Sequence, residues 1–216
     1  MGELRARQDE RLEVIEASVI QLFALVAEGL VASTEALLSG EQELLDVLAE
    51  RERSIGDLYR DIERLVDGQL GDGRPAPGDL RFMLSVLRVV PELERSHDLV
   101  VHIARRAGGG FDAELSPRCR GLIERMGRLG SDMWRQAADS WYERDATAAA
   151  ALVERDDEMD ALHAALSAEI ASGRLALPVA MDMTLVARFY ERLGDHAVNV
   201  ARRVVHLAAT AAAAPS

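Results

Sequence analysis

Hydrophobic residues recur every three or four positions along most of the chain, and this spacing predicts long amphipathic helices. The stretch from 183 to 207 shows the pattern most clearly, because one apolar seam of three- and four-residue steps runs through it without a gap. The seam comprises Met183, Val186, Tyr190, Leu193, Ala197, Val200, Val204 and Leu207. Alternation of apolar and polar positions with period two is almost absent, so the pattern predicts an all-α protein.

Glycine and proline interrupt the apolar pattern at a few places, which are expected to be loops. The clearest are GQLGDGRPAPGD at 68–79 and GGG at 108–110, with shorter interruptions at 115–118 and 172–178. The stretches between them predict six helices, near 4–38, 41–67, 79–107, 117–143, 146–171 and 179–209.

Two segments of the chain repeat each other 97 positions apart. Between 94–106 and 191–203, seven of thirteen residues are identical, and both segments begin with an acidic pair spaced four apart. Each segment falls on the last helix of a group of three, and the glycine run separates the two groups. We therefore predict a tandem repeat of two three-helix bundles, with domains at 1–108 and 109–216.

The acidic pairs have two interpretations. Glu191 and Asp195 lie away from the apolar seam of their helix, as solvated surface carboxylates do. Asp156 and Asp160, on the preceding predicted helix, lie instead at the edge of an apolar stripe that contains Met159. Carboxylates beside a core cost free energy unless they are paired, hydrogen-bonded or metal-bound. Two such pairs on adjacent helices can present four oxygen ligands to a divalent cation.

Composition narrows the class of protein. Hydrophobic residues make up 49% of the chain but aromatic residues only 4%, so the core is expected to consist mainly of aliphatic side chains, which suit helices. Trp134 and Trp141 stand seven apart on one predicted helix, a spacing typical of a core seam. The net charge of −12 argues against nucleic acid or an anionic membrane as a partner, because phosphate groups are bound by basic surfaces.

The single cysteine, Cys119, excludes an intrachain disulfide and suits a reducing compartment. The first sixteen residues are charged throughout and do not have the pattern of a signal peptide. No uninterrupted run of about 18 apolar residues is present, so we expect no membrane insertion. These features together predict a cytoplasmic protein.

The repeated motifs resemble those of the PhoU family, the regulators associated with the high-affinity phosphate transporter. In the first half the resemblance depends on PAPGDLRFMLSVLRVVPELERSHDLVVHIARRA. In the second half it depends on LGSDMWRQAADSWYERDATAAAALVERDDEMDALH and RFYERLGDHAVNVARRV. It covers nearly the whole chain. It implies a pair of three-helix bundles, a homodimer, and acidic motifs that bind a divalent metal ion such as Fe, Mn, Zn or Mg.

The resemblance also implies a set of metal ligands, which the two halves keep unequally. The second half keeps both motifs, Asp156 with Asp160 and Glu191 with Asp195. The first half keeps Glu94 with Asp98, but its earlier motif has Glu52 followed four residues later by Gly56 instead of an acid. His97 stands where the second half has glycine, and it is either a replacement ligand or a polar substitution at a helix edge.

The partners implied by the resemblance are the ATP-binding subunit of a phosphate ABC transporter and a membrane sensor histidine kinase. On this hypothesis the chain is a regulator and not an enzyme. No serine-hydrolase elbow, phosphate-binding loop, Cys-x-x-Cys or His-Glu-x-x-His motif is present.

Two alternatives stay open. One is a ferritin-like carboxylate-bridged metalloenzyme, because Glu94 to His97 has the Glu-x-x-His form and Asp160 to His163 approaches it. The other is a helical adaptor that binds no metal.

Overall fold

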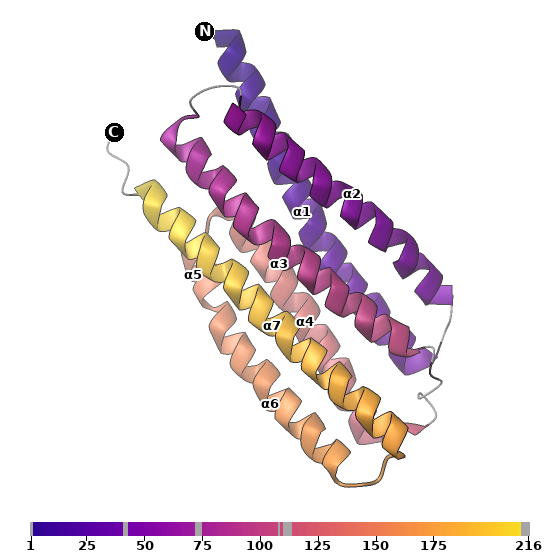
Figure 1. Ribbon diagram of the computed structural model, residues 1–216. Helices are drawn as coiled ribbons and strands as arrows, with labels where there is room; N and C mark the ends of the chain where they lie inside the picture. The colour runs from indigo at the N-terminus through magenta and orange to yellow at the C-terminus, as the bar shows by residue number, and fades with distance from the viewer. Residues whose placement is uncertain (1, 41–42, 72–74, 108, 110–113, 213–216) are drawn as a thin grey trace.

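The computed structural model describes the backbone of residues 2–40, 43–71, 75–107, 109 and 114–212, and the side chains of 6–40, 55–71, 75–107, 109 and 114–209. Within these residues the chain is almost entirely helical and contains no strand, which confirms the all-α prediction (Figure 1). The helices are α1 (Gly2–Ser39), α2 (Glu43–Gly71), α3 (Pro77–Ala107), α4 (Pro117–Glu143), α5 (Ala146–Ala150), α6 (Leu152–Ala171) and α7 (Leu177–Ala212).

The helix ends carry the local signals expected of them. Ser116 caps α4 by accepting the Cys119 backbone N–H at 3.1 Å, and Pro117 takes the first turn, where its missing N–H costs nothing. Gly40 after α1 and Gly173 after α6 have positive φ, which glycine adopts without strain. The prediction of a single helix near 146–171 is wrong, because this stretch forms two helices. Asp145 caps a short α5, and a turn at Ala151 separates it from α6.

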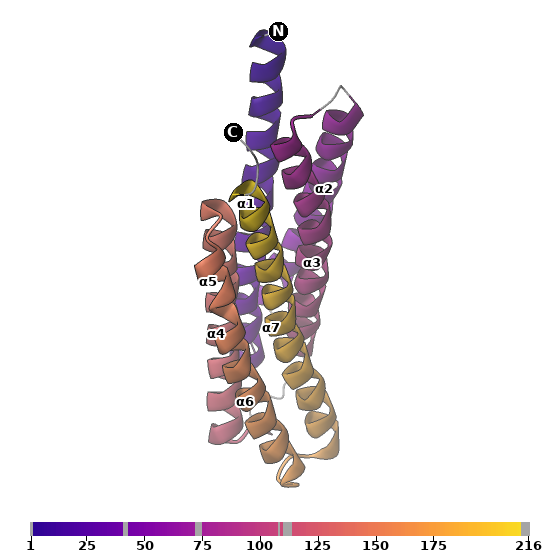
Figure 2. The ribbon, with the colours of Figure 1, turned by 90° about the vertical axis from the view of Figure 1, so that its left-hand side faces the viewer.

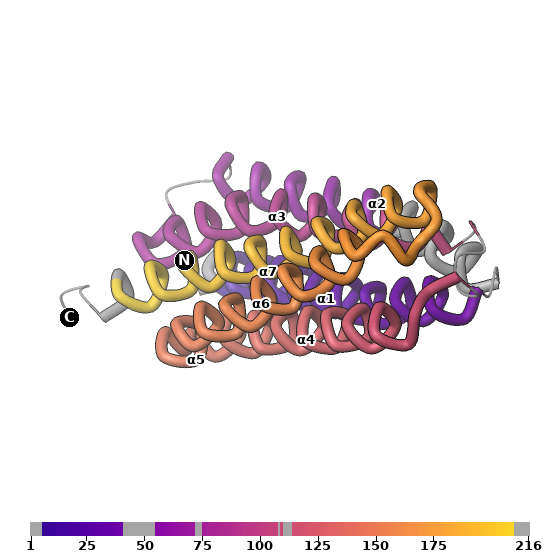
Figure 3. The backbone as a smooth tube through the Cα atoms, turned by 90° about the horizontal axis from the view of Figure 1, so that it is seen from below, coloured from indigo at the N-terminus to yellow at the C-terminus, as the bar shows by residue number. Residues whose placement is uncertain are grey.

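Six of the seven helices in the described residues form a four-helix centre with an outer helix on either side, and the short α5 packs mainly against α7 and α4. Helices α1, α3, α4 and α7 pack together, α2 packs outside α1 and α3, and α6 packs outside α4 and α7. Figure 1 shows α3 and α7 in front of α1 and α4, and Figures 2 and 3 show the same layers from the side and from below. Each half of the sequence therefore supplies two central helices and one outer helix.

The two halves meet through antiparallel helix pairs. Between α1 and α4, Ser131 donates to the Ala27 carbonyl at 3.2 Å, whereas the earlier Arg120 reaches the later Leu38 carbonyl at 2.7 Å. Between α3 and α7, Ser96 contacts His196 at 2.9 Å, whereas Arg106 contacts the earlier Asp182 at 3.2 Å. In both pairs, later residues of one helix contact earlier residues of the other, so the two helices run antiparallel. Two equivalent antiparallel pairs indicate that an approximate two-fold axis relates the halves.

One hydrophobic core extends across both halves. It contains Phe23 of α1, Leu93 of α3, Trp134 of α4 and Tyr190 of α7, all fully buried. Trp141, seven residues after Trp134, is also fully buried, which confirms that the two form a core seam. The predicted domain boundary falls in the connection between α3 and α4, but the core does not divide there, because each half completes the core of the other.

The closest approach of α1 and α4 depends on two glycines. A Cβ at Gly127 would lie 2.4 Å from the hydroxyl oxygen of Thr34, and a Cβ at Gly130 would lie 2.7 Å from Leu30 Cδ2. Thr34 is fixed at this point, because it donates to the Leu30 carbonyl at 2.6 Å and shares a hydrogen bond with the Tyr190 hydroxyl at 2.7 Å. The buried Thr34–Tyr190 pair thus ties α7 to the α1–α4 contact.

Helix α1 is long and apolar enough between Ala6 and Ser39 to cross a bilayer, judged by length and composition only. In the structure it packs against α2, α3 and α4 as a core helix, and core helices commonly meet the same criteria. No other helix in the described residues meets them.

Candidate functional site

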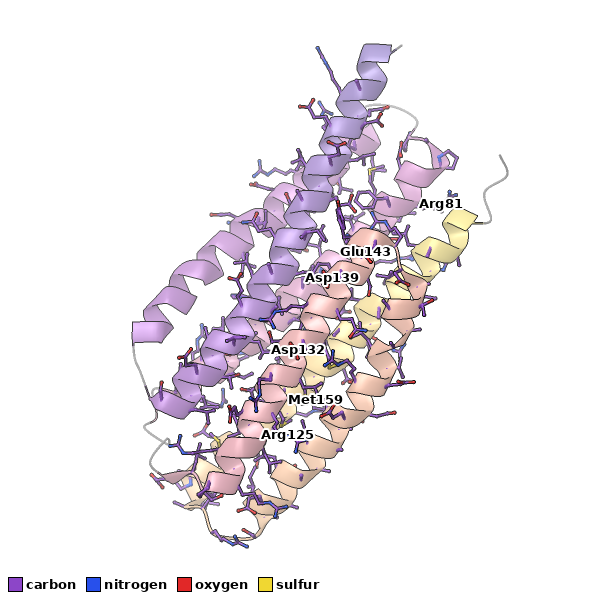
Figure 4. The ribbon with its side chains drawn as sticks, turned by 180° about the vertical axis from the view of Figure 1, so that it is seen from behind. Arg81, Arg125, Asp132, Asp139, Glu143 and Met159 are labelled. Carbon is purple, nitrogen blue, oxygen red and sulfur yellow. The ribbon has the colours of Figure 1, made fainter. Side chains whose placement is uncertain are left out.

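Helices α6 and α7 approach each other closely at Gly194. A Cβ at this position would lie 2.7 Å from Asp156 Oδ1 and 3.3 Å from Met159 Cγ. Met159 fills the space between three helices, because its Cε also lies 3.6 Å from where a Cβ of Gly130 on α4 would be. Figure 4 shows Met159 beside α4, next to the row formed by Arg125, Asp132, Asp139 and Glu143. Gly194 thereby allows α6 to present Asp156 directly to α7.

The structure brings the four predicted carboxylates of the second half within electrostatic range of one another. Burial raises the pKa of Asp156 to about 6, and the negative charges of Asp195, Asp160, Glu191 and the neighbouring Asp157 add to the rise. The anionic form of Asp156 is therefore less stable than that of an ordinary aspartate, and nearby positive charge would stabilise it.

We define the acid cluster as Asp156, Asp160, Glu191 and Asp195, of which Asp156 and Glu191 are partly buried. The side chain of Glu191 is 14% exposed, and its Oε1 forms an ion pair with Arg188. Its other oxygen, Oε2, is buried and has no hydrogen-bond partner. Burial raises the pKa of Glu191, Arg188 and His163 oppose the rise, and Asp195 and Asp160 add to it.

The donor chemistry of the acid cluster suits a hard or borderline divalent cation. Carboxylate oxygens are the preferred ligands of such ions, and the unpartnered Oε2 of Glu191 is a feature that an ion would satisfy. The side chains are neighbours and not a closed ligand set. Among the described residues, no three His, Cys, Asp or Glu side chains converge closely enough to hold one ion.

The first half has a different polar group at the equivalent place. Tyr59 of α2 donates to Glu63 Oε1 at 2.9 Å, and burial together with Glu63 and Glu94 raises the pKa of Tyr59 to about 12. Burial, Asp98 and Glu63 raise the pKa of Glu94, and Arg95 partly opposes them. Sequence reasoning missed Tyr59 and Glu63, although their four-residue spacing on a helix next to Glu94 was the available signal.

Of the remaining predicted ligands of the first half, His97 has a side chain within the described residues. His97 is 3% exposed and lies at the position equivalent to Gly194, so a bulky ring stands where the second half has no side chain. Gly56 supplies no carboxylate, and a Cβ there would meet nothing within 4 Å. The side chain of Glu52 lies outside the described residues.

A second polar contact that sequence reasoning missed joins the halves at the α3–α7 crossing. Fully buried Ser96 contacts Nδ1 of His196 at 2.9 Å, and Glu92 Oε2 lies 3.9 Å from the same nitrogen. Burial lowers the pKa of His196, Glu92 and Asp195 oppose the change, and Arg192 and Arg95 reinforce it. The contact between Ser96 and His196 spans 100 residues of sequence, so no local sequence pattern predicts it.

A groove of about 360 Å³ lies between α1 and α4, away from the acid cluster of α6 and α7. Its lining includes Val31, Thr34, Leu38 and Gly127, with Arg128 at one side. The acid cluster is the better functional candidate, because it concentrates unbalanced charge and an unpartnered buried oxygen, whereas this groove is mainly apolar.

Fold and site together define an internally duplicated helical bundle with acidic pairs on the last helix of each repeat. The PhoU domain model matches residues 19–107 and 123–204, so the chain belongs to the PhoU family.

Relatives align with the chain over nearly its whole length. The phosphate-specific transport system accessory protein PhoU homolog 2 of Mycobacterium tuberculosis is 29% identical over 94% of this chain and 96% of its own. Homolog 1 of Mycobacterium leprae is also 29% identical, over 94% and 92%. The crystal structure of PhoU from Pseudomonas aeruginosa superposes with a TM-score of 0.87 at 25% identity, covering 94% of this chain and 99% of that one.

Proposed function

We propose that this chain is a regulatory accessory protein of phosphate transport that acts by protein contact and not by catalysis. The observation that carries the proposal is the end-to-end likeness to relatives named phosphate-specific transport system accessory proteins. Both repeats and their order are retained over that length, so the likeness is not confined to one helical motif.

The proposed partners are the ATP-binding subunit of a phosphate ABC transporter and a sensor histidine kinase, contacted in the cytoplasm by a homodimer. The proposed output is restraint of phosphate uptake and repression of phosphate-starvation genes. The long helical body (Figure 1) supports this role, because a long exposed helix face is a surface on which a partner helix or domain can dock.

Deleting the gene and restoring it on a plasmid tests the regulatory role. In phosphate-rich medium the deletion strain should take up labelled phosphate faster and express a starvation reporter, and the wild-type gene should reverse both effects. Affinity purification of the tagged chain should recover the transporter ATPase or the kinase. Unchanged uptake and reporter levels in the deletion strain would contradict the proposal.

The second part of the proposal is that the acid cluster binds a divalent metal ion, of which Fe, Mn, Zn and Mg are the candidates. The four carboxylates would supply its oxygen ligands, and the bound ion would offset their mutual repulsion. The unpartnered Oε2 of Glu191 and the raised pKa of Asp156 support this assignment. Glu94 and Asp98 form the weaker candidate, since Gly56 supplies no carboxylate opposite them.

Metal titration with calorimetry and elemental analysis tests the assignment. Asp160→Ala and Asp195→Ala should each weaken binding at least tenfold. Glu158→Ala is a matched control, because Glu158 is an exposed acid of the same helix that reaches Arg125 of α4 at 3.7 Å. Equal affinity in all four proteins favours the metal-free adaptor. Binding that survives the second-half variants but is lost in Glu94→Ala assigns the ion to the first half.

The metalloenzyme alternative gains no support from the geometry. Glu94 and His97 lie on α3, Asp160 and His163 lie on α6, and α7 packs against both helices. A ferritin-like site needs these motifs to face one another around a shared pair of ions.

A further inference from the structure

We propose that Arg188 is an internal counter-ion of the acid cluster that competes with a divalent cation for Glu191. The inference rests on the proposed metal site and assigns a role to a residue outside its ligand set. Arg188 holds Glu191 in the metal-free protein and gives it up when a cation binds.

The first observation is the ion pairing of the acid cluster. Of its four carboxylates, only Glu191 has an ion-pair partner among the described residues, and that partner is Arg188 one turn earlier on α7. The guanidinium contacts Oε1, whereas Oε2 stays buried without a partner. One positive charge therefore meets one oxygen of a group that carries four carboxylates.

The second observation is that Arg188 is easily released. Its side chain is 55% exposed, whereas the Glu191 side chain is 14% exposed. When the pair separates, the guanidinium regains water along an open face of α7, but the carboxylate stays in its partly buried place. Exposed ion pairs contribute little stability, so a divalent charge displaces the arginine at small cost.

The third observation comes from the internal repeat. At the 97-residue offset that superimposes Glu94 on Glu191, the position of Arg188 corresponds to Pro91, which carries no charge. Arg95, the neighbouring arginine of the first half, pairs instead with Glu92 at 2.7 Å. The internal counter-ion thus accompanies the half that retains the complete acid set, as expected if it balances that set.

Competition makes a specific prediction for metal affinity. Removing Arg188 frees both oxygens of Glu191, so Arg188→Gln should bind Zn²⁺ or Mn²⁺ about two- to fivefold more tightly than the wild type, as expected for loss of a competing exposed ion pair. Arg188→Lys keeps the charge but not the planar fork, so its affinity should lie between the two. In a Glu191→Gln background the Arg188→Gln change should have no effect.

The test measures Zn²⁺ and Mn²⁺ isotherms for the full-length wild type, the two Arg188 variants, Glu191→Gln and the double variant. Side-chain NMR of the Arg188 guanidinium, identified by its loss in Arg188→Gln, provides a second readout during Zn²⁺ titration. Tighter binding in Arg188→Gln and a shift of this signal on Zn²⁺ addition support the proposal. Unchanged or weaker binding in Arg188→Gln overturns it, because Arg188 then either is a bystander or positions Glu191 as a ligand.

The failure of this inference is distinguishable from failure of the metal site. If the wild type binds metal and Asp195→Ala does not, the site stands whatever Arg188→Gln does. If only Arg188→Gln binds, competition is stronger than expected and the proposal is supported. If none of the proteins binds either ion, both the metal site and the role of Arg188 are wrong, while the regulatory role is still decided by phosphate uptake.

Discussion

Replacing Gly127 by alanine is expected to separate α1 from α4 and to destabilise the whole protein. The new Cβ would lie 2.4 Å from Thr34 Oγ1, 2.6 Å from its Cγ2 and 3.0 Å from its Cβ. Thr34 cannot turn aside freely, because its β-branched side chain is held by hydrogen bonds to Leu30 and Tyr190. The new methyl group therefore overpacks the contact between the helices, and the shift that relieves it breaks the buried Thr34–Tyr190 hydrogen bond.

The magnitude follows from three contributions. Overpacking a well-filled core costs about 1–3 kcal/mol, and loss of the buried hydrogen bond costs about 0.5–1.5 kcal/mol. Alanine in a helix interior returns about 1 kcal/mol relative to glycine. The net loss is about 2 kcal/mol, which corresponds to a fall in Tm of roughly 4–8 °C for a chain of this size.

Thermal and urea unfolding followed by circular dichroism measure this loss, and Gly121→Ala is the matched control. Gly121 lies on the same helix, and a Cβ there would meet nothing within 4 Å, so its replacement should raise stability by up to about 1 kcal/mol. The cost of Gly127→Ala should shrink in a Thr34→Ala background, where the two nearest atoms are gone. If both glycine variants shift Tm equally, the close approach at Gly127 is not a stability determinant and the reasoning fails.

Three further predictions concern the polar sites. Asp156→Asn in the presence of a chelator should stabilise the protein at pH 8 and not at pH 4. The pKa of Asp156 in the folded wild type is about 6, above its usual 3.8. Ionisation of Asp156 therefore lowers the free energy of unfolding increasingly as pH rises from about 3.8 to about 6. The shift corresponds to about 3 kcal/mol before solvent screening and about 1 kcal/mol after it; a loss of stability at pH 8 would contradict this. Since burial lowers the pKa of His196, wild-type stability should fall as pH drops below about 6.5, and His196→Asn should flatten that slope in urea titrations from pH 5 to 8; an unaltered slope would exclude His196 as its source. Gly56→Asp restores a carboxylate where space is open, so the metal-to-protein ratio measured by elemental analysis should rise; an unchanged ratio would mean that His97 or Tyr59 already blocks the first-half site.

The sequence by itself determined the helices and the internal repeat. Helical periodicity is a local pattern, and the repeat is a likeness between two segments of the same chain, so neither requires knowledge of tertiary contacts. A helix exposes its buried face every 3.6 residues, so the seam from Met183 to Leu207 was visible without any partner helix. The repeat at 94–106 and 191–203 gave the tandem order. The run of alanines after Asp145 contains no such face, and there the sequence failed to separate α5 from α6.

Only the tertiary structure decided which distant side chains meet. The Thr34–Tyr190 hydrogen bond spans 156 residues and the Ser96–His196 contact spans 100, and neither leaves a periodic trace in the chain. Gly194 illustrates the physical reason. Its identity is readable from sequence, but its effect depends on α6 lying against α7 so closely that a Cβ would touch Asp156. Helical periodicity specifies the buried face of each helix, whereas the packing of one helix against another specifies which distant side chains meet.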